Sequence, residues 1–102
     1  MSPEPAGDYK LEHIPAATQH IEAIAAAAKQ AGKLAEFKQI LFEAVRRLTN
    51  DPHGWGDPEF HKLVGGGIVC HGILRPIVFY YVIYESLRSV VLLEVHQFAE
   101  FE

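Results

Sequence analysis

The sequence predicts an α+β fold with the element order β-α-α-β-β-β, in which a helical hairpin packs on one face of a twisted antiparallel sheet. Two observations predict it. Apolar residues recur at helical spacing between residues 15 and 50, and they alternate with a period of two from residue 68 onward. The connections within each half are short, which favours an antiparallel helix pair followed by an antiparallel strand meander.

The first half of the chain contains a short strand and two helices. The stretch "DYKLEHI" alternates in polarity and predicts the strand. "PAATQHIEAIAAAAKQAG" predicts a helix that begins at Pro15 and is closed by Gly32, and "KLAEFKQILFEAVRRLTN" predicts a second helix that ends before Pro52. The inward stripes of these helices are expected to be Ala17, Ile21, Ile24 and Ala28, and Leu34, Phe37, Leu41, Ala44, Val45 and Leu48.

The second half begins with a predicted loop, "HGWGDPEFHKLVGGG", which is rich in Gly, Pro and Asp. Its glycines at 65–67 indicate mobility or a close approach of the backbone. Three strand-like runs follow, "IVCHGIL", "IVFYYVIYE" and "SVVLLEVHQF". The loop therefore separates the helices from the meander.

The length of 102 residues predicts a single domain, which we place at residues 8–98 between a flexible tail at 1–7 and an acidic tail at 99–102. Cys70 is the only cysteine, which excludes an internal disulfide and favours a reducing compartment. No signal peptide and no apolar run of membrane-spanning length is present, so we expect a cytoplasmic protein without a membrane partner. The formal charge of -4 argues against non-specific binding of nucleic acid.

The alternation in the last strand predicts which face of the sheet meets the helices. Val91, Leu93 and Val95 form a purely apolar set that is expected to face the helices. The other set turns polar at Glu94 and His96 and is expected to face solvent or a partner, together with Val90 and Leu92.

The lengths of the links predict the register of the meander. A three-residue link places Tyr80 opposite Glu94 and Val78 opposite His96, and a two-residue turn at Arg75-Pro76 places His71 opposite Tyr80. One face is then expected to collect His71, Tyr80, Tyr84, Glu94 and His96, with Arg75 at its rim.

The segment "FYYVIYESLRSVVLLEVHQF" resembles the "YRVIYE…VVVLAVGHR" end of the RelE/ParE superfamily, small toxins of toxin–antitoxin systems that include plasmid stabilisation proteins. Residues 81–85 match the first part, and residues 90–93, Val95 and His96 match the second. In element order the resemblance covers about residues 8–98. It implies the family's fold and an antitoxin partner.

The resemblance also implies an activity, because ribonuclease members of the family cleave ribosome-bound messenger RNA with residues of the open sheet face and C-terminal segment. Cleavage by attack of a 2′-hydroxyl needs a base, an acid and a cation near the phosphate. We expect His96 or Glu94 as the base, His71 as the acid and Arg75 as the cation. Tyr80 or Tyr84 is suited to stacking an RNA base or to binding a partner.

Two alternatives remain open. Val82 and Gln97 stand where ribonuclease members usually carry arginine, and the chain is acidic where the family is basic. A non-catalytic toxin of the gyrase-poison type, or a small homo-oligomeric α+β binding module, would fit these departures. No metal or other cofactor is expected, because the six histidines lack close ligand spacing and one cysteine forms no thiolate cluster.

Overall fold

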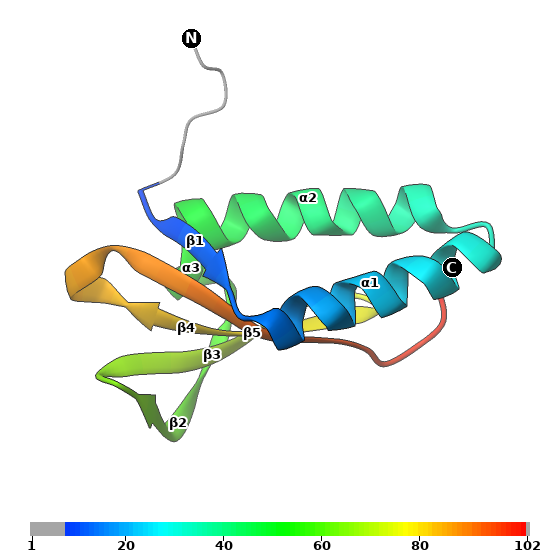
Figure 1. Cartoon of the computed structure of the whole chain (residues 1–102). Helices are drawn as coiled ribbons and strands as arrows, with labels where there is room; N and C mark the ends of the chain where they lie inside the picture. The colour runs from blue at the N-terminus through cyan, green and yellow to red at the C-terminus, as the bar shows by residue number, and fades with distance from the viewer. Residues whose placement is uncertain (1–7, 102) are drawn as a thin grey trace, which may run out of the picture.

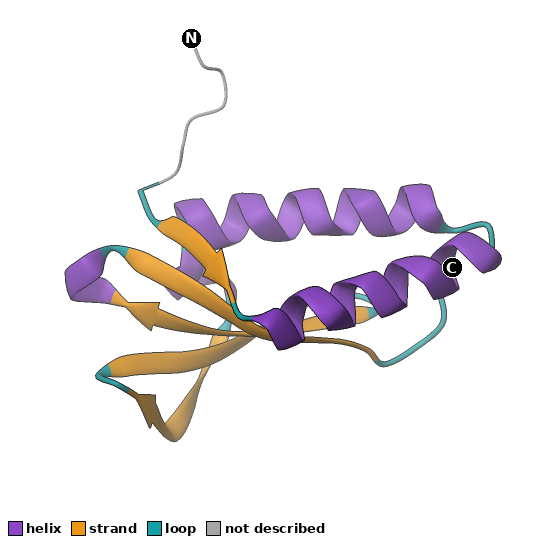
Figure 2. Ribbon diagram, in the orientation of Figure 1, coloured by secondary structure: helices purple, strands orange, loops and turns teal. Residues whose placement is uncertain are grey.

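The structure is a computed structural model that describes residues 8–101 and, within them, all side chains except those of residues 59–64. The tail predicted at residues 1–7 lies outside the described residues. The fold is the predicted α+β arrangement, with a helix pair on one side of a twisted sheet (Figures 1 and 2). Its elements are β1 (Lys10–His13), α1 (Pro15–Gln30), α2 (Leu34–Asn50), α3 (Pro52–Trp55), β2 (Asp57–Val64), β3 (Gly67–Leu74), β4 (Ile77–Tyr84), the 3₁₀ turn η1 (Glu85–Leu87) and β5 (Ser89–Gln97).

The sheet is mixed, in the order β1-β5-β4-β3-β2. β3, β4 and β5 form the predicted antiparallel meander, and β2 adds a further antiparallel strand beside β3. β1 instead runs parallel to β5 and pairs along residues 10–13. No hairpin joins β1 to β5, so the chain is free to lay β1 along the edge of β5 in the parallel direction. β1 ends opposite Leu92, and the remainder of β5 extends beyond it.

The prediction of a loop at residues 53–67 is wrong. The segment contains α3 and an eight-residue strand, β2, which pairs with β3 at the edge of the sheet. Gly65 and Gly66 have φ angles of +57° and +86° and form the tight turn between β2 and β3. Pro58 is compatible with an edge strand, because an edge residue can do without a ladder hydrogen bond.

α3, at the end of the helical layer, packs against β4 in the centre of the sheet. The Trp55 ring stacks on the Tyr81 ring, with a centroid distance of 5.7 Å and an interplanar angle of 9°. The Tyr81 hydroxyl donates a hydrogen bond of 2.7 Å to the Pro52 carbonyl oxygen. Gly72 lies beneath Trp55, since an added Cβ would come within 2.6 Å of the indole. Trp55 is therefore an anchor on the core.

The core lies between the helix pair and the sheet. The predicted stripe of α1 is confirmed, with Ala17, Ile24 and Ala28 buried and Ile21 packed against them. On α2 the stripe is confirmed for Phe37, Leu41, Ala44 and Leu48, whereas Leu34 is only partly buried outside the core cluster and Val45 is 46% exposed. The buried face of β4 is the predicted one and consists of Ile77, Phe79, Tyr81 and Ile83.

A β-bulge in β5 corrects the predicted faces of that strand. Tyr80 pairs with Glu94, but Tyr81 pairs with Leu92, so Leu93 is an extra residue in β5. The extra residue reverses the alternation, which places Val90 and Leu92 in the core rather than on the outer face. Val91 and Leu93, predicted to face the helices, are not in the core cluster, whereas Val95 is.

Candidate functional site

Four of the predicted site residues lie together on the sheet face that is turned away from the helices, called the open face below. Tyr80 on β4 pairs with His71 on β3 and with Glu94 on β5, as predicted. The predicted three-residue link between β4 and β5 is wrong, because Tyr84 pairs with Ser89 across a four-residue link, and the bulge at Leu93 restores the expected pairing. Its ring centroid lies 5.9 Å from that of His71 and 6.1 Å from that of His96. Because three adjacent strands supply these side chains, hydrogen bonding of the sheet fixes their relative positions.

A short hydrogen bond joins two members of this group. His96 Nε2 lies 2.8 Å from Glu94 Oε1, and both side chains are about half exposed. An ion pair at that exposure contributes little to stability. Its chemical effect is to orient the imidazole: a carboxylate only accepts, so Nε2 carries a proton, and in the neutral imidazole Nδ1 is then an acceptor. An imidazole with a bare nitrogen and a carboxylate behind it is the arrangement expected of a general base.

His20 on α1 belongs to the same group, although the sequence analysis did not select it. Its ring centroid lies 4.8 Å from that of His96. The backbone N–H of Val95 donates a hydrogen bond of 3.2 Å to His20 Nδ1. His20 thus satisfies a strand N–H at the edge of β5, just past the point where β1 ends.

Arg75 and Tyr84 lie at different ends of the sheet. Arg75 is in the β3–β4 turn, and its guanidinium carbon is 5.5 Å from the centroid of the Phe98 ring. Tyr84 pairs with Ser89 at the other end of β4, so roughly 13 Å of strand separates it from Tyr80. The open-face group is therefore His71, Tyr80, Glu94, His96 and His20, without Tyr84.

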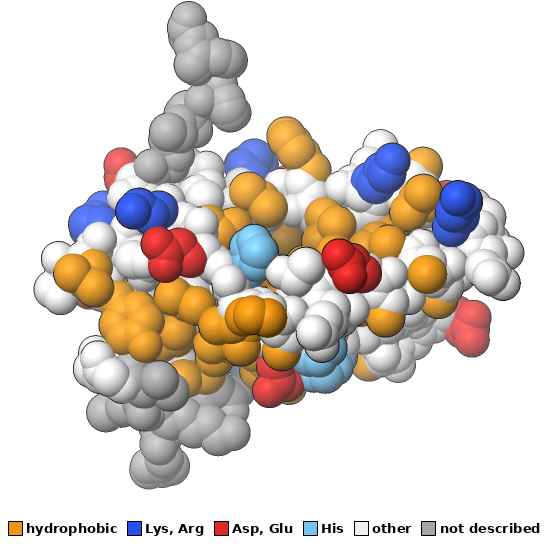
Figure 3. Space-filling model, viewed as in Figure 1, with side chains coloured by type: hydrophobic (Ala, Val, Ile, Leu, Met, Phe, Trp, Pro, Cys, Tyr) orange, Lys and Arg blue, Asp and Glu red, His pale blue; other side chains and the backbone are white. Residues whose placement is uncertain are grey.

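The bulge changes which apolar side chains belong to the open face, because Val90 and Leu92 lie in the core whereas Val91 and Leu93 are partly exposed outside it. Ile73 has an exposed fraction of 51%. Val82 is buried. On the side of the molecule drawn in Figure 3, hydrophobic side chains gather over the strands at the lower left.

A second polar cluster surrounds Glu85, in the turn between β4 and β5. Its carboxylate accepts hydrogen bonds from His53 Nε2 (2.8 Å), from the Tyr9 hydroxyl (2.7 Å) and from Arg88 (2.6 Å). These bonds, that of His53 first, lower the pKa of Glu85 to about 2. Tyr9 and His53 come from parts of the chain that are distant from the turn with Glu85 and Arg88. We therefore interpret the cluster as a set of contacts that hold the N-terminal strand and α3 against this turn.

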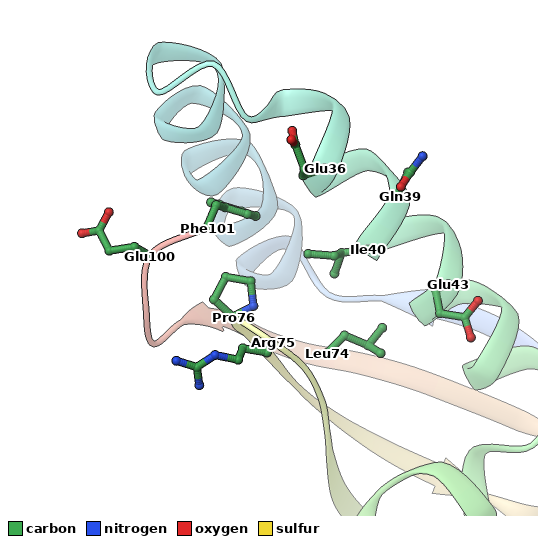
Figure 4. Close-up of a pocket in the computed structure, with 9 residues that line it drawn as sticks. All are labelled: Glu36, Gln39, Ile40, Glu43, Leu74, Arg75, Pro76, Glu100 and Phe101. Carbon is green, nitrogen blue, oxygen red and sulfur yellow. The ribbon is translucent and has the colours of Figure 1, made fainter.

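A groove of about 470 Å³ lies between α2, the β3–β4 turn and the C-terminal residues (Figure 4). Its floor is apolar and its rim carries Glu36, Glu43 and Glu100. Phe101 closes one end and packs edge-on against Phe37, with ring centroids 6.2 Å apart. Figure 4 shows the Arg75 guanidinium extending away from Ile40 and Leu74. The groove is thus separate from the open-face group.

Within the described residues, no three His, Cys, Asp or Glu side chains are grouped so that they could hold a metal ion. Cys70 is buried in the core. None of the helices in residues 8–101 combines the length and apolar character needed to cross a membrane.

No protein-family model matches the chain, and a search of curated proteins finds no significant match. Among solved structures, a chain of the toxin–antitoxin complex RelBE2 from Mycobacterium tuberculosis is similar to this one, with a TM-score of 0.71 and 16% sequence identity. The superposition covers 96% of this chain and 100% of that chain. The predicted RelE-type fold is thereby confirmed.

Proposed function

We propose that this protein is the toxin component of a toxin–antitoxin system. The observation that carries the proposal is the match that covers 96% of this chain and 100% of a chain from a toxin–antitoxin complex. At 16% identity the match supports the fold alone. The side chains on the open face provide the further support for the proposed role.

The proposed activity is cleavage of messenger RNA on the ribosome. His96, oriented by Glu94, is suited to removing the proton from a 2′-hydroxyl through Nδ1. Tyr80, between two histidines, offers a ring on which an unpaired base can stack. His71 is proposed as the acid that protonates the leaving 5′-oxygen, and Arg75 as a cation that attracts the RNA backbone from the rim.

The proposed partner is an antitoxin whose binding covers the open face and excludes RNA. An antitoxin of this kind is encoded beside its toxin, so a short neighbouring reading frame is the expected source. Co-expression with that frame is expected to yield a complex and to restore growth. A neighbouring product that neither binds nor protects would contradict the partner proposal.

Controlled expression in bacteria tests the toxin proposal. Wild-type protein is expected to arrest growth, and His96→Ala is expected to relieve the arrest. His13→Ala is the matched control, because His13 is an exposed histidine on β1 whose ring bonds to Thr18 rather than to the open-face group. Harmless expression of soluble, folded wild-type protein would contradict the proposal.

A second candidate function is a non-catalytic toxin that binds a protein target. Two observations favour it: the buried Val82 in place of an arginine, and the formal charge of -4. In this case growth arrest would survive substitution of both His71 and His96. A homo-oligomer formed through the open face is the remaining alternative, and sedimentation of a monomer would argue against it.

A further inference from the structure

His20 and His96 form a pair of neighbouring rings that come from different layers of the fold. α1 packs across β5, and the ring centroids are 4.8 Å apart with an interplanar angle of 40°. Each ring has one nitrogen in a hydrogen bond, to Val95 N–H for His20 and to Glu94 for His96. Neither ring makes another hydrogen bond to the side chains and backbone that the structure describes, so each has one nitrogen left for a ligand.

One of the two hydrogen-bonded nitrogens is a donor and the other is an acceptor, and this determines whether the remaining nitrogen of each ring accepts or donates. His96 donates from Nε2 to a carboxylate, which leaves Nδ1 as a bare acceptor. His20 accepts at Nδ1 from a backbone N–H, which requires Nδ1 to be unprotonated and places the ring proton on Nε2. The pair therefore presents one acceptor and one donor to a ligand.

Cleavage of a nucleotide phosphodiester requires a hydrogen-bond acceptor and a hydrogen-bond donor close to each other. The attacking 2′-hydroxyl has a proton to give, and the non-bridging phosphate oxygens gain negative charge as the phosphorus is attacked. A donor held in place before the reaction stabilises that charge without reorganisation. A neutral imidazole serves this purpose when its second nitrogen is tied to a fixed partner.

We propose that His20 is an RNA-binding catalytic residue that donates from Nε2 to a non-bridging oxygen of the scissile phosphate, beside His96. The inference rests on the proposed function, because it assigns the substrate contact at the same site. In the step, the 2′-oxygen bonds to phosphorus and the bond from phosphorus to the 5′-oxygen breaks. The 2′-hydroxyl proton passes to His96 Nδ1, and the departing 5′-oxygen takes a proton from the acid, for which His71 is proposed. The products are a 2′,3′-cyclic phosphate and a 5′-hydroxyl.

Two substitutions separate the structural hydrogen bond of His20 from its proposed contact with phosphate. In His20→Asn, the amide oxygen takes the place of Nδ1 and can accept from Val95 N–H, but the outer N–H is lost. In His20→Gln, the amide nitrogen takes the place of Nε2 and keeps the outer donor, while the acceptor for Val95 is lost. A structural role predicts that Gln is the more harmful change, and a phosphate contact predicts that Asn is.

The expected result is a fall of about 10²- to 10³-fold in ribosome-dependent cleavage for His20→Asn, with slow exchange of the Val95 amide hydrogen retained. His20→Gln is expected to keep most of the cleavage and to exchange Val95 faster. Full cleavage by His20→Asn, alongside loss of cleavage by His96→Ala, would overturn the role of His20 and leave the proposed function standing.

A binding measurement keeps the inference testable apart from turnover. Inorganic phosphate is titrated into the full wild-type chain, labelled with ¹⁵N in its histidine rings. The His20 Nε2–H resonance is expected to shift with phosphate in wild type and in His96→Ala. A shift without any cleavage would support the phosphate contact and contradict the nuclease function. The absence of a shift would overturn the inference.

Discussion

Replacing Tyr81 by phenylalanine tests how α3 is held against the sheet. The Tyr81 side chain is fully buried, and its hydroxyl bonds with a backbone group of α3. It donates to the Pro52 carbonyl at 2.7 Å and lies close to Gly56. Phenylalanine keeps the ring that stacks on Trp55 and removes only this oxygen.

The expected cost follows from the Pro52 carbonyl, which is left without this partner. A buried backbone group that loses its hydrogen bond costs about 1–3 kcal/mol. Pro52 is fully buried, so we expect a loss of about 1–3 kcal/mol in the free energy of unfolding. For a domain of this size, that loss lowers Tm by at least about 4 °C.

Urea unfolding followed by circular dichroism measures this loss. The midpoint is expected to fall with an unchanged m value, since the change affects stability and not the surface exposed on unfolding. Tyr84→Phe is the matched control, because the Tyr84 hydroxyl makes no hydrogen bond among the described residues, and a change within about 0.5 kcal/mol is expected. Equal effects of the two substitutions would refute the role assigned to the Tyr81 hydroxyl.

Further predictions concern the Glu85 cluster and the packing of α3. The pKa of Glu85 is lowered from 4.5 to about 2, so its bonds stabilise the fold above pH 4.5, and this stabilisation is lost as the pH falls toward 2. The difference in unfolding free energy between wild type and Glu85→Gln is therefore expected to be largest above pH 5 and to vanish near pH 2, and a difference independent of pH would contradict the cluster. Gly72→Ala places a Cβ within 2.6 Å of the indole of Trp55, so we expect about 1–3 kcal/mol of destabilisation and a red shift in fluorescence, since Trp55 is the only tryptophan. Wild-type emission and stability in Gly72→Ala would show that Trp55 does not lie over Gly72.

Sequence patterning predicted most of the fold because the apolar periods of both halves are regular. It failed at β5, where one extra residue reverses the alternation, and no pattern in "VVLLEV" marks which residue is extra. It failed again at β2, whose Asp, Pro and His residues are typical of a loop. Pairing with β3 and the Gly65-Gly66 turn stabilise this strand, and both are tertiary features.

The candidate site was predicted in part. The register of β3 and β4 follows from the two-residue turn at Arg75-Pro76, which places His71 opposite Tyr80. The expected pairing of Tyr80 with Glu94 is also present, but it rested on a three-residue link, whereas the link has four residues and the bulge at Leu93 compensates for the difference. The sequence nevertheless holds a signal for His20, which was missed. His20 is three residues after Ala17 and four before Ile24, so it lies at the margin of the buried stripe of α1. A polar residue at such a position needs a partner, and the partner is a strand N–H that only the structure reveals.

The most direct test of the central claim is to map RNA ends in bacteria shortly after the protein is induced. The proposed reaction leaves 5′-hydroxyl ends within translated messenger RNAs, and these are expected in wild type and in His13→Ala but not in His96→Ala. They are also expected to disappear when initiation of translation is blocked. Growth arrest by the wild type without new 5′-hydroxyl ends would contradict cleavage of RNA by the open face.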